Sequence, residues 1–246
     1  MSCNTVLKSN AHLKVLGCGN TNAYPETPEG LDRSMSLLYY SRIRFITRLS
    51  PLLTTSTHPS HIISVYAAGS ERMGTFHPSD LGLRGTNPKT YSFANCRTNV
   101  VYMTTMMFEH LAQQHRGKLA LLHVWPGLVI TPAYKADYHP WWFKILLRLV
   151  IPFLRLVAVS PEEIGQRLLF CADSERFPAA EEEGREAIKA TDGTVGGGAY
   201  AIKYTGEDAK VQKYYAKLRE EGFGEKVVEH TMEAFRVVDE GRRFEG

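Results

Sequence analysis

The chain has 246 residues, 43% of them apolar, which suits one domain, 1–246, with a sizeable core. Its 29 Lys and Arg against 26 Asp and Glu give a formal charge of +3, scattered without a basic patch, so nucleic-acid binding is not expected. The cysteines lack CxxC spacing and flanking histidines, so no metal is expected and they are typical of free thiols. The N-terminus has no apolar run of signal-peptide length, and we expect a cytoplasmic protein.

Apolar runs alternate with helical periodicity in the first half of the chain. A buried strand is predicted over 13–16, followed by apolar residues at helical spacing over 31–49, with Pro51 closing the helix. Branched residues predict a second strand over 61–67. After a loop rich in glycine and proline, a second long helix is expected to start near Tyr91.

The middle of the chain contains a third strand, predicted over 119–125 and broken by Pro126-Gly127. Ser160-Pro-Glu-Glu163 is a capping box with proline at the first helical position, which predicts a helix through 164–172. The acidic stretch around 181–183 is expected to be a surface loop or a short helix.

Three glycines, 196–198, lead into a last predicted strand over 199–204. No lysine or threonine follows them at P-loop spacing, so a flexible turn is favoured over a phosphate cradle. Two charged helices are expected from about Asp208 and Gly224, within 208–240.

Strands separated by helices predict an α/β fold with a doubly wound parallel sheet. In such sheets ligands bind at the carboxyl ends of the strands. Segments 17–19, 66–69 and 126–131 are therefore expected to face one crevice.

Segment 139–158 is strongly apolar but contains three basic residues and Pro152, which argues against a membrane span. Lys144 and Arg148 share one helical face, which indicates an amphipathic helix. Three roles are open for it: a lid over an apolar substrate, a peripheral membrane contact, or core and subunit packing.

The stretch His123-Val-Trp-Pro-Gly-Leu-Val-Ile-Thr131 resembles the Pro-Gly-x-Val-x-Thr turn of the short-chain dehydrogenase/reductase family. The family's Thr-Gly-x-x-x-Gly-x-Gly fingerprint is absent, so the resemblance implies a partial Rossmann-like sheet without the N-terminal glycine-rich βαβ unit. The resemblance spans roughly 13–238. Within the family, the chain resembles most specifically a fungal natural-product subgroup, which includes the dehydrogenase of fungal abscisic acid synthesis. Four segments carry this similarity: 29–32, 38–45, 91–97 and 225–231.

In that family a tyrosine exchanges a proton with the substrate oxygen, and a lysine four residues on binds the ribose and lowers the tyrosine pKa. Two registers fit this sequence. In one, Tyr91 is followed by Asn95, which can bind a ribose but carries no charge. In the other, Phe93 replaces the tyrosine and Arg97 the lysine, which keeps the cation without the proton carrier.

The family's serine falls at Ala67, beside Tyr66, and its helix asparagine falls near Tyr40. The crevice could therefore hold Tyr40, Tyr66 and Tyr91 near Arg97 as a substitute acid/base set. The alternative is that these tyrosines only pack and form hydrogen bonds.

The resemblance also implies an NADP or NAD cofactor and an apolar substrate site. His123, inside a strand, is more typical of a core histidine than of a ligand. The expected cofactor contacts are Gly17, Gly19, Pro126, Gly127, Val129 and Thr131, and the expected substrate contacts are Trp125, Trp141 and Trp142.

These features favour an NAD(P)-dependent oxidoreductase that acts on a hydroxyl or ketone of a hydrophobic small molecule, with a terpenoid favoured, in fungal secondary metabolism. A homo-oligomer is expected, because a sheet lacking three strands leaves an open edge. The alternative is a non-redox protein of the same fold: a pseudoenzyme, a ligand-binding protein or an isomerase. No Gly-x-Ser-x-Gly elbow supports a hydrolase.

Overall fold

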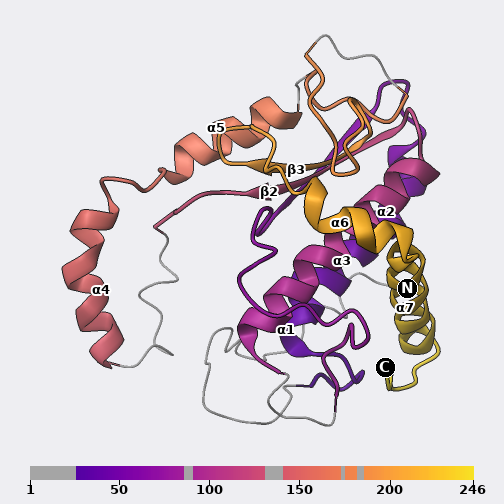
Figure 1. The fold of residues 1–246 in the computed structure, drawn as a ribbon, viewed down its shortest axis with the longest axis horizontal. Helices are drawn as coiled ribbons and strands as arrows, with labels where there is room; N and C mark the ends of the chain where they lie inside the picture. Colours follow the sequence, from indigo (N-terminus) through magenta and orange to yellow (C-terminus); the bar gives the residue numbers. More distant parts are fainter. Residues whose placement is uncertain (1–25, 86–90, 131–140, 173–174, 182–185) are drawn as a thin grey trace.

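A computed structural model describes residues 26–85, 91–130, 141–172, 175–181 and 186–246. The strand predicted over 13–16 lies outside these ranges, as does most of the segment around 181–183. Helices and strands alternate along the described chain (Figure 1). The elements are α1 (Arg33–Met35), the π-helix η2 (Ser36–Tyr40), α2 (Ser41–Leu53), β1 (Ser60–Val65), α3 (Phe93–Gln114), β2 (Leu119–Trp125), α4 (Trp141–Leu154), α5 (Pro161–Ala172), β3 (Ala199–Lys203), α6 (Gln212–Glu220) and α7 (Phe223–Asp239).

The three strands form a parallel sheet in the order β1-β2-β3, which confirms the predicted α/β fold and is consistent with a partial Rossmann-like sheet. Ser60 pairs with Leu119 and Val65 with Val124. The ladder continues past β1, because the Tyr66 N–H donates to the Val124 carbonyl at 2.8 Å. The carboxyl ends of β1 and β2 therefore meet at one edge, as expected.

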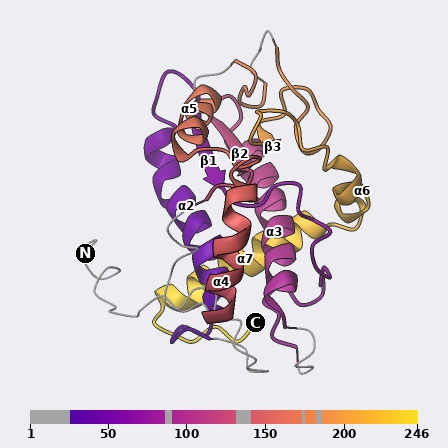
Figure 2. The ribbon, with the colours of Figure 1, turned by 90° about the vertical axis from the view of Figure 1, so that its left-hand side faces the viewer.

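The central strand β2 is buried on both faces. Leu119 and Leu121 belong to the cluster that includes residues of α2, α3 and α7, whereas Ala120 and Leu122 pack with residues of α5 and the loop before β3. Alternate side chains of a strand point to opposite faces, so a continuous apolar strand needs cover on both. Figure 2 shows α5 and the pair α2 and α3 around the sheet.

N-terminal capping hydrogen bonds explain where two helices, α5 and α3, begin. The Ser160 hydroxyl accepts a hydrogen bond from the Glu163 N–H at 3.1 Å, which confirms the capping box of α5. Helix α3 begins at Phe93, two residues later than predicted, because Ser92 is extended and its hydroxyl accepts from the Asn95 N–H at 3.1 Å.

Two predicted boundaries are wrong. Pro51 does not close its helix but lies inside α2, because proline removes only its own N–H and the Thr54 N–H still donates to the Ser50 carbonyl at 2.9 Å. The helix expected from Asp208 begins at Gln212, since the Asp208 carboxylate accepts from the Lys210 N–H at 2.7 Å in a turn with Lys210 at φ 57°.

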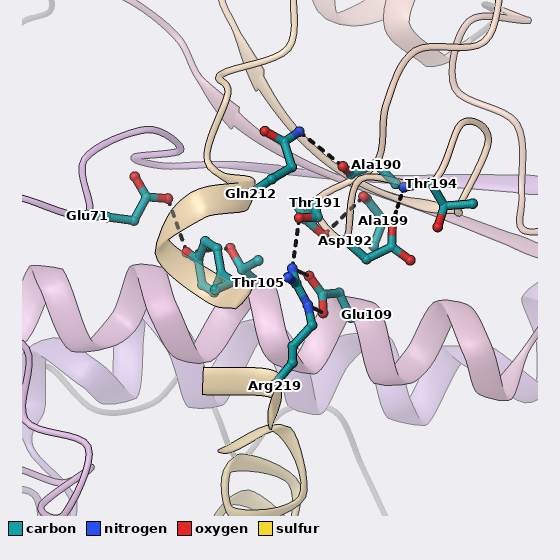
Figure 3. Close-up of polar contacts among 11 residues, drawn as sticks. Glu71, Thr105, Glu109, Ala190, Thr191, Asp192, Thr194, Ala199, Gln212 and Arg219 are labelled. Atoms are coloured by element: carbon teal, nitrogen blue, oxygen red, sulfur yellow. Dashed lines mark hydrogen bonds and ion pairs between the residues drawn. The ribbon is translucent and has the colours of Figure 1, made fainter. Parts of the chain in front are cut away.

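Helix α6 is tied to α3 and to the loop before β3 (Figure 3). Arg219 donates to both carboxylate oxygens of Glu109, at 2.9 and 2.7 Å, and to the Thr191 carbonyl at 2.7 Å. The buried Tyr215 hydroxyl lies 3.1 Å from Glu71 and 3.1 Å from Thr105. These bonds anchor a charged helix whose sequence alone offers little apolar surface.

Helix α4 stands apart from the sheet (Figure 1). Among the helices in the described ranges, none combines the length and apolarity needed to cross a bilayer. Five apolar side chains at helical spacing are between 49% and 72% exposed: Trp142, Ile145, Leu146, Leu149 and Phe153.

The last glycine before β3 provides a test of the packing at the start of that strand. Gly198 has φ +83°, and an added Cβ would lie 2.8 Å from the Ala180 nitrogen, whereas Gly206 has φ +78° and open space around it. We expect Gly206→Ala to cost about 1 kcal/mol of unfolding free energy for the left-handed backbone alone. Gly198→Ala should cost about 2 kcal/mol more because the backbone must shift. Equal losses in urea unfolding would contradict this account.

Candidate functional site

Four side chains meet at the carboxyl ends of β1 and β2, and we refer to them as the Arg–Tyr cluster: Arg42 of α2, Tyr66 directly after β1, Arg97 of α3 and His123 of β2. The ring of Tyr66 stacks on His123 with centroids 6.3 Å apart and planes 10° apart. The guanidinium carbons of Arg42 and Arg97 lie 5.5 and 5.6 Å from the centre of the Tyr66 ring. Both distances suit cation–π contact.

Backbone and sheet contacts hold two members of the cluster in place. Arg42 donates to the Ser64 hydroxyl at 3.0 Å and to the Val65 carbonyl at 2.8 Å, so α2 is fixed against the end of β1. The Nε2 atom of His123 lies 3.2 Å from the backbone N–H of Ala67 and accepts from it, which assigns the ring hydrogen to Nδ1.

Three polar atoms of the cluster are buried without a hydrogen-bond partner among the described residues: the Tyr66 hydroxyl, the Arg97 Nε and the His123 Nδ1. An unpaired buried polar group is costly, and most such groups in native proteins are paired. Three of them at one sheet edge indicate a site where a ligand supplies the missing partners.

Burial and charge set the protonation of the cluster. Burial raises the pKa of Tyr66, against the opposing effect of Arg97, so at neutral pH the phenol keeps its proton. Burial, with the charges of Arg42 and Arg97, lowers the pKa of His123 to about 3, so this ring is neutral. The cluster therefore offers two cations and a phenolic proton donor.

Tyr91 and Asn95 are engaged in other contacts. The Tyr91 hydroxyl donates to the buried Asp32 carboxylate at 2.8 Å, and burial together with this negative charge raises the pKa of Tyr91. The Asn95 side-chain oxygen accepts from the Thr75 N–H at 2.9 Å, which holds the loop after β1. Cys96, a buried free thiol, lies 3.6 Å from Asp32.

Tyr40 points to a different element. Its hydroxyl lies 2.7 Å from Nε2 of His230 on α7. The structure thus places Tyr66 beside Arg97, Tyr91 on Asp32 and Tyr40 on α7.

The predicted cofactor turn is partly described. Gly127 has φ +76°, and an added Cβ would lie 3.1 Å from the Tyr204 ring, so the Pro126-Gly127 bend needs glycine. Val129 forms a parallel bridge with Val159. Gly17, Gly19 and Thr131 lie outside the described residues.

The tryptophans of the expected substrate wall lie on two elements. Trp125 ends β2, is 37% exposed and meets the Tyr204 ring edge-on with centroids 5.9 Å apart. Trp141 and Trp142 begin α4, and only the side chain of Trp142 is described. In the described part of the chain, no group of three His, Cys, Asp or Glu side chains could hold a metal.

Sequence reasoning did not assign a functional role to Arg42 or His123. Arg42 occupies a position in the apolar stripe predicted over 31–49. A permanently charged side chain at a position expected to face the sheet is unusual, and this was the sequence feature that could have indicated a functional role for Arg42. His123 carried no comparable signal, since a histidine inside a strand most often packs in the core.

No protein-family model matches the chain. It is 36% identical over 214 residues to the short-chain dehydrogenase/reductase SAT2 of Stachybotrys chartarum, covering 84% of this chain and 59% of that protein. It is 35% identical over 214 residues to oxidoreductase AN1596 of Emericella nidulans, covering 84% and 62%. Oxidoreductase lepF of Aspergillus flavus is 30% identical over 273 residues, covering 97% and 73%. The chain thus spans about three-fifths of the length of the first two relatives.

Two buried histidines should make stability depend on pH. The pKa values of His123 and His230 are lowered to about 3 and about 4, mainly by burial, against an ordinary value of 6.5. As pH falls below 6.5 the unfolded chain takes up protons that the folded rings refuse, so stability falls by about 1.4 kcal/mol per pH unit for each ring.

The measurement is urea unfolding at pH 7, 6 and 5. Burial raises the pKa of Asp32 and Glu71, and these carboxyl groups change stability in the opposite direction near their own titration range. We therefore compare wild type with His230→Gln, which can still bond Tyr40 and should show a smaller loss, and with His58→Gln at an exposed position. Identical pH dependence in all three proteins would contradict the assignment.

Proposed function

Because this chain belongs to the short-chain dehydrogenase/reductase family of fungal oxidoreductases, we propose that the Arg–Tyr cluster is its catalytic site. The proposed reaction is hydride transfer between NADP or NAD and a hydroxyl or ketone of a hydrophobic small molecule in fungal secondary metabolism. The observation that carries the proposal is the Tyr66 hydroxyl, which lies beside Arg97 and is unpaired within the described ranges. It stands at the carboxyl end of β1, where parallel sheets bind ligands.

The unpaired groups of the cluster fit a nicotinamide dinucleotide. When bound, the dinucleotide supplies or accepts the hydride. In one register Arg97 takes the place of the family's lysine and offers hydrogen-bond donors for the ribose hydroxyls. In the other register Asn95 has this role. Pro126, Gly127 and Val129 would border the nicotinamide half, with Thr131, Gly17 and Gly19 completing the contacts.

We assign the proton transfer to Tyr66 in preference to Tyr91. The Tyr66 phenol is protonated and has no hydrogen-bond partner among the described residues, so it can donate to a carbonyl oxygen during reduction. Arg97 and Arg42 then stabilise the phenolate that forms. Tyr91 already donates to Asp32, whose charge opposes loss of its proton. The Tyr40 hydroxyl is hydrogen-bonded to His230, so we assign Tyr40 a structural role.

The substrate would be apolar, with a terpenoid as the favoured class and the abscisic acid pathway as the narrowest candidate. Trp125, Trp141 and Trp142 would form its apolar wall, with α4 as a lid. A terpenoid has large apolar surface and few polar groups, which suits such a wall.

We also propose a cytoplasmic homo-oligomer. The described sheet leaves one edge of β1 open, and α2 exposes Phe45, Leu49 and Leu52. Open edges and clustered apolar side chains are usually covered by another surface.

The test combines cofactor binding with paired tyrosine variants. We expect NADPH or NADH to bind with micromolar Kd, followed by nicotinamide fluorescence. In assays with apolar ketones, Tyr66→Phe should lower kcat by about 100-fold or more with little change in dinucleotide Kd.

Tyr214→Phe, on the half-exposed face of α6, is the matched control and should keep wild-type kcat. If Tyr91→Phe abolishes turnover and Tyr66→Phe does not, the proton carrier is Tyr91. Absence of binding to either dinucleotide up to millimolar concentration rejects the oxidoreductase proposal.

A further inference from the structure

The Arg–Tyr cluster carries two positive charges without a counter-ion. In the part of the chain that the structure describes, neither Arg42 nor Arg97 forms an ion pair with a carboxylate. The charges and side chains that influence the pKa of Arg42, Tyr66 and His123 include no aspartate or glutamate. Two partly buried cations at one place repel each other, and a buried charge is unfavourable unless it is paired.

Two other partly buried arginines of the described chain are paired with carboxylates. Arg219 forms two hydrogen bonds with Glu109, and Arg84 lies 3.1 Å from Glu26. Arg97 differs from both, because its buried Nε finds no partner in the part of the chain that the structure describes, where its contact is with the Tyr66 ring. In the described part of the chain, the contact with the Tyr66 ring holds Arg97 in place, without an ion pair.

We propose that Arg97, supported by the charge of Arg42, binds an anionic oxygen group of the ligand, a carboxylate or a phosphate. A guanidinium presents its donors in a planar fork that matches either group. The inference extends the proposed function, because it adds that a substrate or cofactor of this site carries an anion close to the Tyr66 hydroxyl. A carboxylate would come from the substrate and a phosphate from the dinucleotide.

The experiment measures anion binding without dinucleotide. Sodium benzoate, inorganic phosphate and neutral benzamide are titrated into the protein by calorimetry, and thermal unfolding is recorded with each. We expect at least one anion to bind at millimolar concentration and to raise the Tm, while benzamide does neither.

Variants of Arg97 locate the binding. Arg97→Met should weaken anion binding by roughly 10- to 100-fold, the usual size of a lost charge-assisted hydrogen bond. Its Tm without anion should stay close to that of wild type, because the variant removes an uncompensated charge together with the contact on the Tyr66 ring. Arg97→Lys keeps the charge but loses the fork, so an intermediate affinity is expected. Arg116→Met removes one charge beyond the far end of α3, from exposed Arg116, and should bind as wild type does.

The outcomes separate the sources of the anion. Binding of benzoate alone supports a substrate carboxylate, binding of phosphate alone supports the dinucleotide, and binding of both supports the shared chemistry. The proposal is overturned if neither anion binds, if Arg97→Met binds as tightly as wild type, or if Arg97→Met unfolds, since unfolding would show that Arg97 is structural. Anion binding with no dinucleotide binding would reject the proposed function and leave this inference standing.

Discussion

The parallel ladder between β1 and β2 is the constraint on which the site depends. It brings the ends of both strands to one edge and leaves each face of β2 to be covered by helices. Because side chains alternate along a strand, His123 points to the same face as Leu121, toward α2 and α3. Arg42 and Arg97, one on each of these helices, then meet Tyr66 at the end of β1. A slip of one residue would turn His123 toward α5 and separate the group.

The larger features of the fold could be predicted from the sequence because they rest on local patterns. A short run of branched residues predicted the strand over 61–67, Pro126-Gly127 marked the end of the strand over 119–125, and the capping box at Ser160 located α5 through a hydrogen bond between residues three apart. The errors at Pro51 and Asp208 have another origin. At both places neighbouring hydrogen bonds override the usual preference of the residue type. A backbone bond from Thr54 to Ser50 carries α2 past its proline, and the Asp208 carboxylate accepts from the Lys210 N–H and folds 208–210 into a turn.

The candidate site could be predicted only in part. Tyr66 and Arg97 were identified through family registers, and the structure places them side by side. The partner of Tyr91 could not be predicted, because Asp32 lies 59 residues away and nothing local links them. The position of the Arg42 guanidinium in the cluster could not be predicted, because a long side chain within an apolar stripe can pack on the core with its charged end at a polar site. Tertiary contacts decide which of these polar groups are already paired and which are left for chemistry.

The unpaired groups of the Arg–Tyr cluster also bear on how long the protein survives in a cell. Two charges that have no carboxylate partner, and a hydroxyl that has no hydrogen-bond partner, among the described residues weaken the native state at the proposed ligand site. A bound molecule that satisfies them shifts the folding equilibrium toward the native chain and lowers the unfolded fraction that proteases degrade. If the proposed site binds such a molecule, the abundance of the protein would rise and fall with the supply of that ligand.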